Sequence, residues 1–99
     1  MSRVYAPKAD SNHGEIRGFY EDLYCSVYDV HIVPGFVDFV VGVQTKHGRV
    51  NELVEVKTED GKPTAKQKRF ACEWRGKAPV VVRTKADVIA HVERLRSGL

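Results

Sequence analysis

The sequence predicts an α/β domain in which helices flank a mixed β-sheet. Apolar residues recur at helical spacing in three segments, and four other segments are rich in valine and other strand-forming residues. One helical segment separates the last two strand segments, and a strand-helix-strand succession implies a right-handed crossover. The predicted order of elements is therefore α-β-β-β-α-β-α.

The composition fits a single small globular domain. The chain has 99 residues, of which 42% are hydrophobic and 29% charged, enough for one modest core. No stretch approaches the roughly 18 consecutive apolar residues of a membrane helix. The first residues lack the apolar segment of a secretory signal, so we expect a cytoplasmic location. Cys25 and Cys72 are too few for a disulfide scaffold and are expected to be free, at least partly buried thiols.

The charge of the chain is unevenly distributed. Sixteen basic and 13 acidic residues give a net charge of +3, which permits an anionic partner without requiring one. Between Lys57 and Lys77, however, seven residues are basic and only three are acidic. This local excess of positive charge suits a nucleic-acid phosphate backbone.

The N-terminal part of the chain predicts an arm followed by a helix. Residues 1–11 have no apolar period and are expected to form a loose arm before a domain at 12–99. A helix is predicted over 12–24, where apolar residues recur at helical spacing. Asn12, with Glu15 three residues later, matches a capping box at its start.

Three strand segments follow this helix. They are predicted at residues 27–33, 36–43 and 50–57, where valine and aromatic residues dominate. A tight hairpin turn at Lys46–Gly48 is expected to join the last two.

The C-terminal part predicts a helix, a short strand and a final helix. Thr64 and Gln67 form a second capping box, and the helix that they begin has a small apolar side made of Phe70, Ala71 and Trp74. The valine run at 79–82 predicts a buried strand. Thr84 and Asp87 then cap a helix. The residues expected to face inward from it are Val88, Ile89, Val92 and Leu95.

The histidines and the large aromatic residues carry no clear functional pattern. The four histidines share no spacing and are expected on the surface or in loops: His13, His31, His47 and His91. Trp74 is expected in the core. Three tyrosines could stack on unpaired bases, but core packing is the better interpretation for Tyr20, Tyr24 and Tyr28.

Two carboxylates stand where apolar residues are expected. Asp38 lies between Val37 and Phe39, and Glu55 lies between two valines of the next predicted strand. If the hairpin turns at Lys46 and His47, Asp38 pairs directly with Glu55. If it turns one residue later, Asp38 pairs with Lys57 and Glu55 becomes a diagonal neighbour. The two carboxylates are close in either register.

Two interpretations of this pair remain open. Like charges held together among valines need a compensating cation, and oxygen ligands favour Mg²⁺ or Mn²⁺. Lys57 is two residues beyond Glu55 and therefore on the same face of the strand, where it could serve an attacking water or a phosphate. Alternatively, Asp38, Glu55 and Lys57 form an ordinary cross-strand cluster of salt bridges.

These residues also fit a known pattern. Asp38, followed after sixteen residues by Glu55-Val56-Lys57, resembles the core motif of the PD-(D/E)XK nuclease superfamily. Further matching segments narrow the resemblance to the VRR-NUC (virus-type replication-repair nuclease) family, and it covers nearly the whole chain after the arm. The matching segments are Gly35 to Gly42, Leu53 to Thr58, Gly61-Lys62, Gln67, Phe70, Glu73 to Gly76, and Val80 to Thr84, with Asp10, Asn12 and Glu15-Ile16 upstream. The chain departs from the family in having Val37 where a proline usually precedes the aspartate.

The resemblance implies a restriction-endonuclease-like fold and a metal-dependent DNA phosphodiesterase, of a kind found in small phage-encoded proteins and in larger repair nucleases. Asp38, Glu55 and the carbonyl of Val56 would ligate Mg²⁺ or Mn²⁺, and Lys57 would serve the water and the phosphate. Two further residues match the acidic residue of the family's first helix and the glutamine of its second, namely Glu15 and Gln67. Each also has a purely structural interpretation as the fourth residue of a capping box.

The resemblance also suggests partners. The basic residues near the second predicted helix would contact the DNA backbone, although a solvated helix face is the alternative for each: Lys62, Lys66, Lys68, Arg69 and Arg75. Small stand-alone family members tend to be homodimers, which suggests branched DNA such as a four-way (Holliday) junction or a flap as substrate. The competing hypotheses are a DNA-binding module that keeps the fold without turnover, and a protein-interaction domain whose acidic pair is salt-bridged.

Overall fold

The computed structural model describes residues 12–98 of the chain. The predicted N-terminal arm at residues 1–11, and with it Asp10 of the resemblance, lies outside the described residues. Within residues 12–98, no helix is long and apolar enough to cross a membrane.

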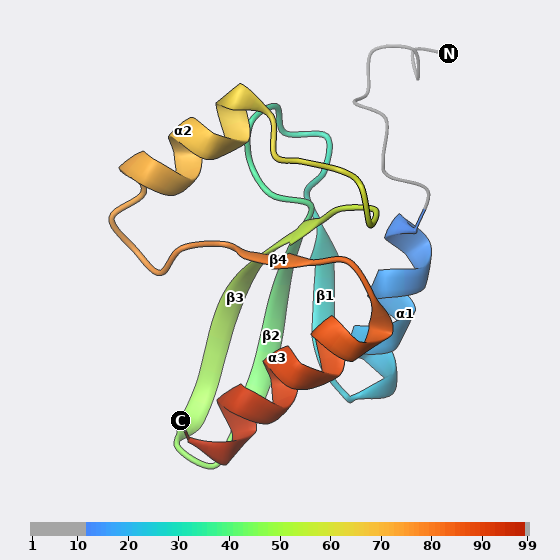
Figure 1. Ribbon diagram of the computed structural model, residues 1–99. Helices are drawn as coiled ribbons and strands as arrows, with labels where there is room; N and C mark the ends of the chain where they lie inside the picture. Colours follow the sequence, from blue (N-terminus) through green and yellow to red (C-terminus); the bar gives the residue numbers. More distant parts are fainter. Residues whose placement is uncertain (1–11, 99) are drawn as a thin grey trace.

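The element order confirms the predicted α/β fold (Figure 1). The elements are α1 (His13–Asp22), β1 (Ser26–Asp29), β2 (Phe39–Thr45), β3 (Gly48–Val56), α2 (Ala65–Glu73), β4 (Val80–Val82) and α3 (Lys85–Ser97). The first strand is shorter than predicted and the second begins later, because the chain between them turns twice instead of extending. Backbone hydrogen bonds from Val33 to Val30 and from Phe36 to Val33 close these turns.

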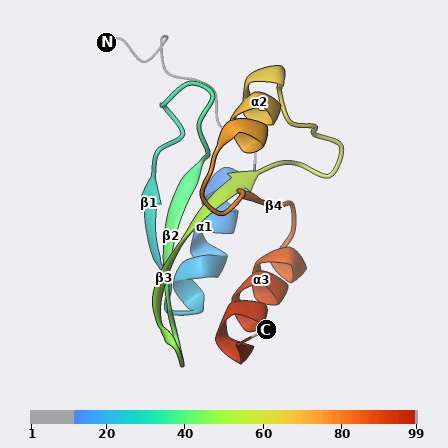
Figure 2. The same ribbon diagram turned by 90° about the vertical axis from the view of Figure 1, so that its left-hand side faces the viewer.

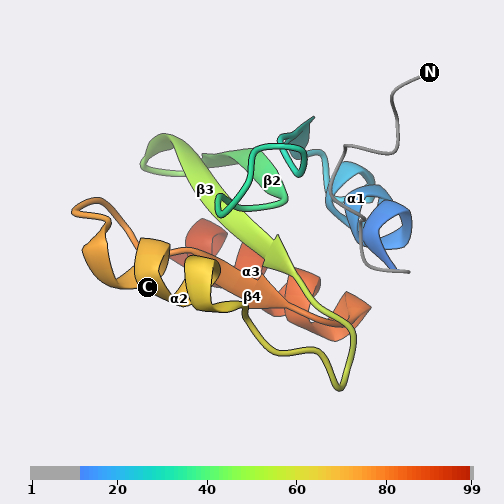
Figure 3. The same cartoon turned by 90° about the horizontal axis from the view of Figure 1, so that it is seen from above.

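The strands form one mixed sheet in the order β1-β2-β3-β4. β1, β2 and β3 are antiparallel neighbours, and β4 lies parallel to β3 at the edge. Helices α1 and α3 cover one face of the sheet (Figure 2), and α2 stands at the end where β3 finishes. Viewed from above, α1 and α2 lie on different sides of β3 (Figure 3). This end of the sheet therefore lies between α1 and α2, two helices that are far apart in the sequence.

The β2–β3 hairpin adopts the first of the two registers considered. Phe39 pairs with Val54 and Thr45 with Gly48, so the turn residues are Lys46 and His47. The alternative register, shifted by one residue, is wrong. Regular pairing ends just before Asp38, whose backbone N–H donates to the carbonyl of Val54 over 3.0 Å.

The core lies between the sheet and the helices α1 and α3. Alternate residues of β2 and β3 point into it, as expected for strands with one face buried. Its fully buried members include Ile16, Tyr20, Phe39, Val41, Val43, Val54, Val56, Val82, Val88 and Val92. Burying each valine side chain stabilises the fold by about 1.5–2 kcal/mol.

The helix ends confirm two of the three predicted capping boxes. Thr64 with Gln67 and Thr84 with Asp87 each make both reciprocal hydrogen bonds. The box predicted at Asn12 and Glu15 is wrong, because the Asn12 side chain makes no cap hydrogen bond. Its Nδ2 instead donates to the carbonyls of Lys57 and Arg83, each over 3.1 Å. Those carbonyls lie just beyond β3 and β4, where the ladder no longer supplies a donor for every carbonyl.

Several burial predictions are wrong. Tyr24 and Tyr28 are 91% and 74% exposed. Tyr24 lies where the chain turns away after α1, at φ +64°. Tyr28 lies on the side of β1 that no helix covers. Trp74 is 47% exposed and stacks on Phe70 rather than entering the core. Cys72 is exposed on α2, which buries none of its residues, whereas Cys25 is buried as predicted.

Two histidines that were expected near the surface are buried. His13 follows the helical period of Ile16 and Tyr20, so it lies on the inner face of α1. His91 is 2% exposed, and its ring connects three elements. Its Nδ1 lies 2.7 Å from the hydroxyl of Tyr20, and its Nε2 lies 2.9 Å from Oε1 of Glu52, so it hydrogen-bonds both side chains. Burial raises the pKa of Tyr20 well above its usual range, so the phenol keeps its proton.

The Tyr20–His91–Glu52 chain is expected to stabilise the fold. Replacing His91 with Phe fills a similar volume but leaves a buried hydroxyl and a buried carboxylate without their shared partner. We expect a loss of about 2–4 kcal/mol in the free energy of unfolding, measured by urea denaturation. His47→Phe, in the exposed hairpin turn, serves as control and should change stability by less than about 0.5 kcal/mol. Equal effects of both substitutions would contradict this assignment.

Asn12 can be tested by a substitution that separates capping from bridging. Asp is as good an N-cap as Asn, so Asn12→Asp would be tolerated if the residue acted as a cap. A carboxylate cannot donate to the carbonyls of Lys57 and Arg83. We therefore expect Asn12→Asp to lower the unfolding free energy at least as much as Asn12→Ala, by about 1–3 kcal/mol for each. Thermal and urea unfolding measure both variants, and wild-type stability of Asn12→Asp would show that the bridge is unimportant.

Candidate functional site

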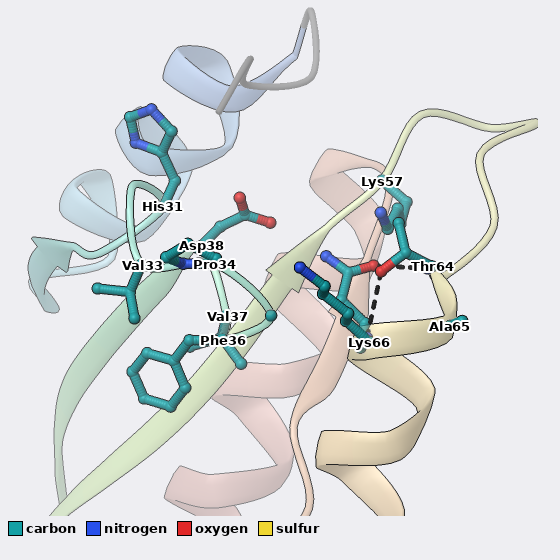
Figure 4. Close-up of a pocket in the computed structure, with 12 residues that line it drawn as sticks. His31, Val33, Pro34, Phe36, Val37, Asp38, Lys57, Thr64, Ala65 and Lys66 are labelled. Atoms are coloured by element: carbon teal, nitrogen blue, oxygen red, sulfur yellow. Dashed lines mark hydrogen bonds between the residues drawn. The ribbon is translucent and has the colours of Figure 1, made fainter. Parts of the chain in front are cut away.

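A cavity of about 590 Å³ opens at the end of the sheet where β3 finishes and α2 begins (Figure 4). Three segments line it: the turns between β1 and β2, the end of β3, and the start of α2. Its polar lining side chains are His31, Asp38, Lys57, Thr64, Lys66 and Gln67. In Figure 4 the Asp38 carboxylate lies on one side of this space and Lys57 on the other. The sequence predicted four of these residues as site residues: Asp38, Lys57 and Gln67 for the chemistry, and Lys66 as a DNA contact.

Asp38 is held at the mouth of the β2–β3 pair. Its Oδ2 accepts a hydrogen bond from the backbone N–H of Val56 over 2.7 Å, which fixes the carboxylate against β3. Its Oδ1 lies 3.8 Å from Nε2 of His13. Val37, the residue before Asp38, is 3% exposed and lines the cavity, so its side chain supports the loop by packing.

Glu55 and Lys57 form a buried ion pair at the end of β3. The residues are 4% and 8% exposed, and Lys57 Nζ lies 3.6 Å from Glu55 Oε2. Being two residues apart on one strand, they share a face, as predicted. The backbone N–H of Lys57 donates to the carbonyl of Val82 over 3.0 Å, which extends the parallel pairing with β4. The ammonium group is thus held between the buried carboxylate and the cavity.

Gln67 forms the predicted capping box and also contacts Glu55. Its Oε1 accepts from the backbone N–H of Thr64 over 2.9 Å, while the Thr64 hydroxyl accepts from the backbone N–H of Gln67 over 3.1 Å. The remaining Nε2 donates to Oε2 of Glu55. The capping box therefore orients the amide so that its nitrogen points at the carboxylate. This contact joins the start of α2 to the end of β3.

Glu15 does not line the cavity. It is exposed, and two residues along a helix it projects about 200° around the axis from the buried His13. His13 is the residue of α1 whose side chain approaches Asp38. Helical periodicity contained a signal for this placement, because His13 lies three residues before Ile16 and seven before Tyr20.

Two side chains for which the sequence predicted no role at the site position the chain around Lys57. The Arg83 guanidinium donates through Nη1 to the carbonyls of Thr58 and Gly61, over 2.8 and 2.6 Å. Asn12 bonds the carbonyl of Lys57 itself. The loop between β3 and α2 is therefore fastened at three carbonyl groups. No local sequence pattern reveals such contacts, since the partners are 22 to 45 residues apart.

The predicted DNA-contacting residues are all exposed. Lys66, Lys68 and Arg69 lie at different positions around the axis of α2. Lys66 lines the cavity, and its Cβ lies 3.4 Å from the position that a Cβ on Gly35 would occupy. The glycine, at φ +74°, lets the β1–β2 segment approach the start of α2 this closely. The flanking basic residues are Lys62 and Arg75.

The donors at this end of the sheet are the carboxylate oxygens that a hard divalent cation prefers. Asp38, just before β2, and Glu55, on β3, are each held by a hydrogen-bond donor. Glu55 itself lines a second, smaller cavity that shares Phe36, Val37 and Gln67 with the first. Mg²⁺ and Mn²⁺ are bound by one or two such carboxylates, and the remaining positions are filled by water and phosphate oxygens. A ligand role for the Val56 carbonyl stays a prediction.

Comparisons with protein-family models, with curated proteins and with solved structures found no match to this chain.

Proposed function

We propose that the protein is an Mg²⁺- or Mn²⁺-dependent DNA endonuclease that hydrolyses phosphodiester bonds. The observation that carries the proposal is the arrangement of Asp38, Glu55 and Lys57 at the end of the β2–β3 pair. Glu55 contacts Lys57 and Gln67, which line the same cavity as Asp38. A buried carboxylate-lysine pair beside a second oriented carboxylate is costly to maintain, which favours a role in chemistry over one in stability alone.

Each residue has a defined part in this proposal. Asp38 and Glu55 would hold the metal ion, which when bound supplies positive charge to the phosphodiester and lowers the pKa of the attacking water. The Val56 N–H keeps the Asp38 carboxylate in place, and Gln67 does the same for Glu55. The ammonium group of Lys57 orients the water and stabilises charge that develops on the phosphate.

The exposed basic residues around α2 would bind the DNA backbone beside the cavity. Phosphate contacts of this kind position a duplex without reading its sequence, which suits recognition of DNA structure. We further propose a homodimer with two sites, acting on branched DNA such as a four-way junction or a flap, in the cytoplasm. A protein that sediments as a monomer and cuts only linear single strands would contradict this part of the proposal.

Cleavage should depend on the metal and on Asp38 and Lys57. We expect a labelled four-way junction, flap or duplex to be cut with Mg²⁺ or Mn²⁺ and not with EDTA. Asp38→Asn keeps the shape and an acceptor for the Val56 N–H but loses the charge, so the rate should fall about 100-fold or more. Lys57→Met, which keeps the aliphatic stem, should show a similar loss. Gel electrophoresis of the products measures both.

The control for cleavage is Lys46→Ala, in the hairpin turn at the opposite end of the sheet (Figure 1). It should cut at the wild-type rate. Circular dichroism and urea unfolding establish that each variant is folded. Binding without cutting in any metal would favour the alternative, a DNA-binding module that retains the fold without turnover. Cutting by Asp38→Asn at the wild-type rate would refute the assigned site.

Backbone contacts should be visible in the salt dependence of binding. Lys66→Ala and Arg69→Ala are each expected to weaken binding to all DNA structures alike and to reduce the slope of log K against log salt by about 1. Fluorescence anisotropy in EDTA measures binding without cleavage. Lys46→Ala again serves as the matched exposed control, and its slope should equal that of the wild type. Unchanged slopes for Lys66→Ala and Arg69→Ala would place the DNA elsewhere.

A further inference from the structure

A second group of potential metal ligands lies beside the cavity. His13 at the start of α1, Asp29 at the end of β1 and His31 in the following turn each offer one ligand atom, and these atoms all lie within 4.8 Å of one another. The three residues come together only because α1 packs against β1. Asp29 and His31 are two residues apart, but His13 is 16 residues upstream.

The geometry of Asp29 and His31 is already fixed by hydrogen bonds. Asp29 Oδ1 lies 2.7 Å from His31 Nδ1 and accepts from the backbone N–H of His31 over 3.0 Å. Partial burial alone would raise the pKa of Asp29, but the hydrogen bonds from His31 and the nearby ring of His13 hold it below its usual value.

His13 supplies an independent observation. The residue is 9% exposed, and its Nε2 is buried without a hydrogen-bond partner in the structure of residues 12–98. The nearest carboxylate oxygen, Oδ1 of Asp38, lies 3.8 Å away, which is too far for a hydrogen bond. The ring also packs on Phe39 and lies edge-on to His31, with centroids 4.4 and 4.9 Å away. Leaving such a nitrogen unpaired costs about 1–3 kcal/mol, and a bound cation would remove that cost.

We propose that His13, Asp29 and His31 form a binding site for a divalent transition-metal ion, best represented by Zn²⁺. Zn²⁺ accepts two imidazoles and one carboxylate as ligands, whereas Mg²⁺ and Ca²⁺ prefer oxygen ligands and disfavour imidazole. In a tetrahedral site with bonds of about 2.0–2.2 Å, donor atoms lie about 3.4 Å apart, so small side-chain shifts would complete it. His31 lines the cavity, which leaves the fourth position accessible to water or a phosphate oxygen.

This site is separate from the pair proposed to act in DNA cleavage. The catalytic proposal uses the carboxylates of Asp38, before β2, and Glu55, on β3, and needs a hard cation, whereas this site uses two imidazoles, from α1 and the turn after β1, with the carboxylate that ends β1. A metal ion here would join α1 to β1. It would stabilise the folded state by an amount that grows with its concentration and its affinity. The two proposals can therefore fail independently.

The test is to titrate the chelator-treated full chain with ZnCl₂ alone and to measure binding by isothermal titration calorimetry. We expect one equivalent to bind to the wild type and the affinity of Asp29→Asn and His31→Ala to fall tenfold or more. His47→Ala, which removes an exposed histidine in the hairpin turn, should bind like the wild type. Glu55→Gln should also retain Zn²⁺ binding, which separates this site from the carboxylate pair.

Two further readouts keep the test decisive if a variant folds poorly. In ¹H–¹⁵N spectra of the wild-type imidazole rings, Zn²⁺ should shift the signals of His13 and His31 and leave those of His47 and His91 in place. Zn²⁺ should also raise the melting temperature of the wild type but not of His31→Ala. Absence of binding, wild-type affinity of His31→Ala, or shifts confined to His47 would each overturn the proposal.

Discussion

The structure around the cavity depends on the burial of Glu55 in the middle of the sheet. β3 is an interior strand with a neighbour on each side, so the residues at its end are not exposed along a free sheet edge. A carboxylate removed from water costs several kcal/mol unless charged and hydrogen-bonding partners replace the solvent. Lys57 supplies the charge and Gln67 the hydrogen bond. The requirement to compensate one buried carboxylate thus determines where the start of α2 must lie.

This dependence explains why α2 can remain in place with so little packing. The helix buries none of its residues, and its aromatic contact is Phe70 against Phe36, with ring centroids 5.2 Å apart. Polar contacts at its first turn therefore carry much of the positioning. The preceding loop is fastened by Arg83, and the carbonyl of Lys57 is bonded by Asn12. Side chains from α1 and from the end of β4 thus complete hydrogen bonding where the ladder stops.

How far the sequence could predict this molecule depends on the range of each interaction. Local patterns succeeded: the element order and the boxes at Thr64 and Thr84 are set by neighbours in the chain. The hairpin register was left as two alternatives, of which the structure adopts the first. The prediction that Asn12 caps α1 was wrong because the same side chain can cap a helix or bridge two distant carbonyls, and only the packing of α1 decides which of the two it does. The prediction that His91 lies near the surface was wrong for the same reason, since its hydrogen-bond partners come from α1 and β3. The sequence foresaw the residues that one hairpin brings together, but from α1 it proposed Glu15, whereas His13 is the residue that approaches Asp38.

The contact between His13 and Asp38 bears on both proposed metal sites. The 3.8 Å between Nε2 and Oδ1 places an imidazole at the edge of the carboxylate pair, so the two donor sets are neighbours. Their chemistry keeps them distinct, because oxygen donors select hard cations and imidazole selects ions such as Zn²⁺. A shift of α1 toward the sheet would bring the imidazole of His13 close enough to share the ligand Asp38. Asn12, one residue before His13, resists that shift by bonding the ends of β3 and β4. The anchoring of α1 therefore sets the separation between the two sites as well as the stability of the helix.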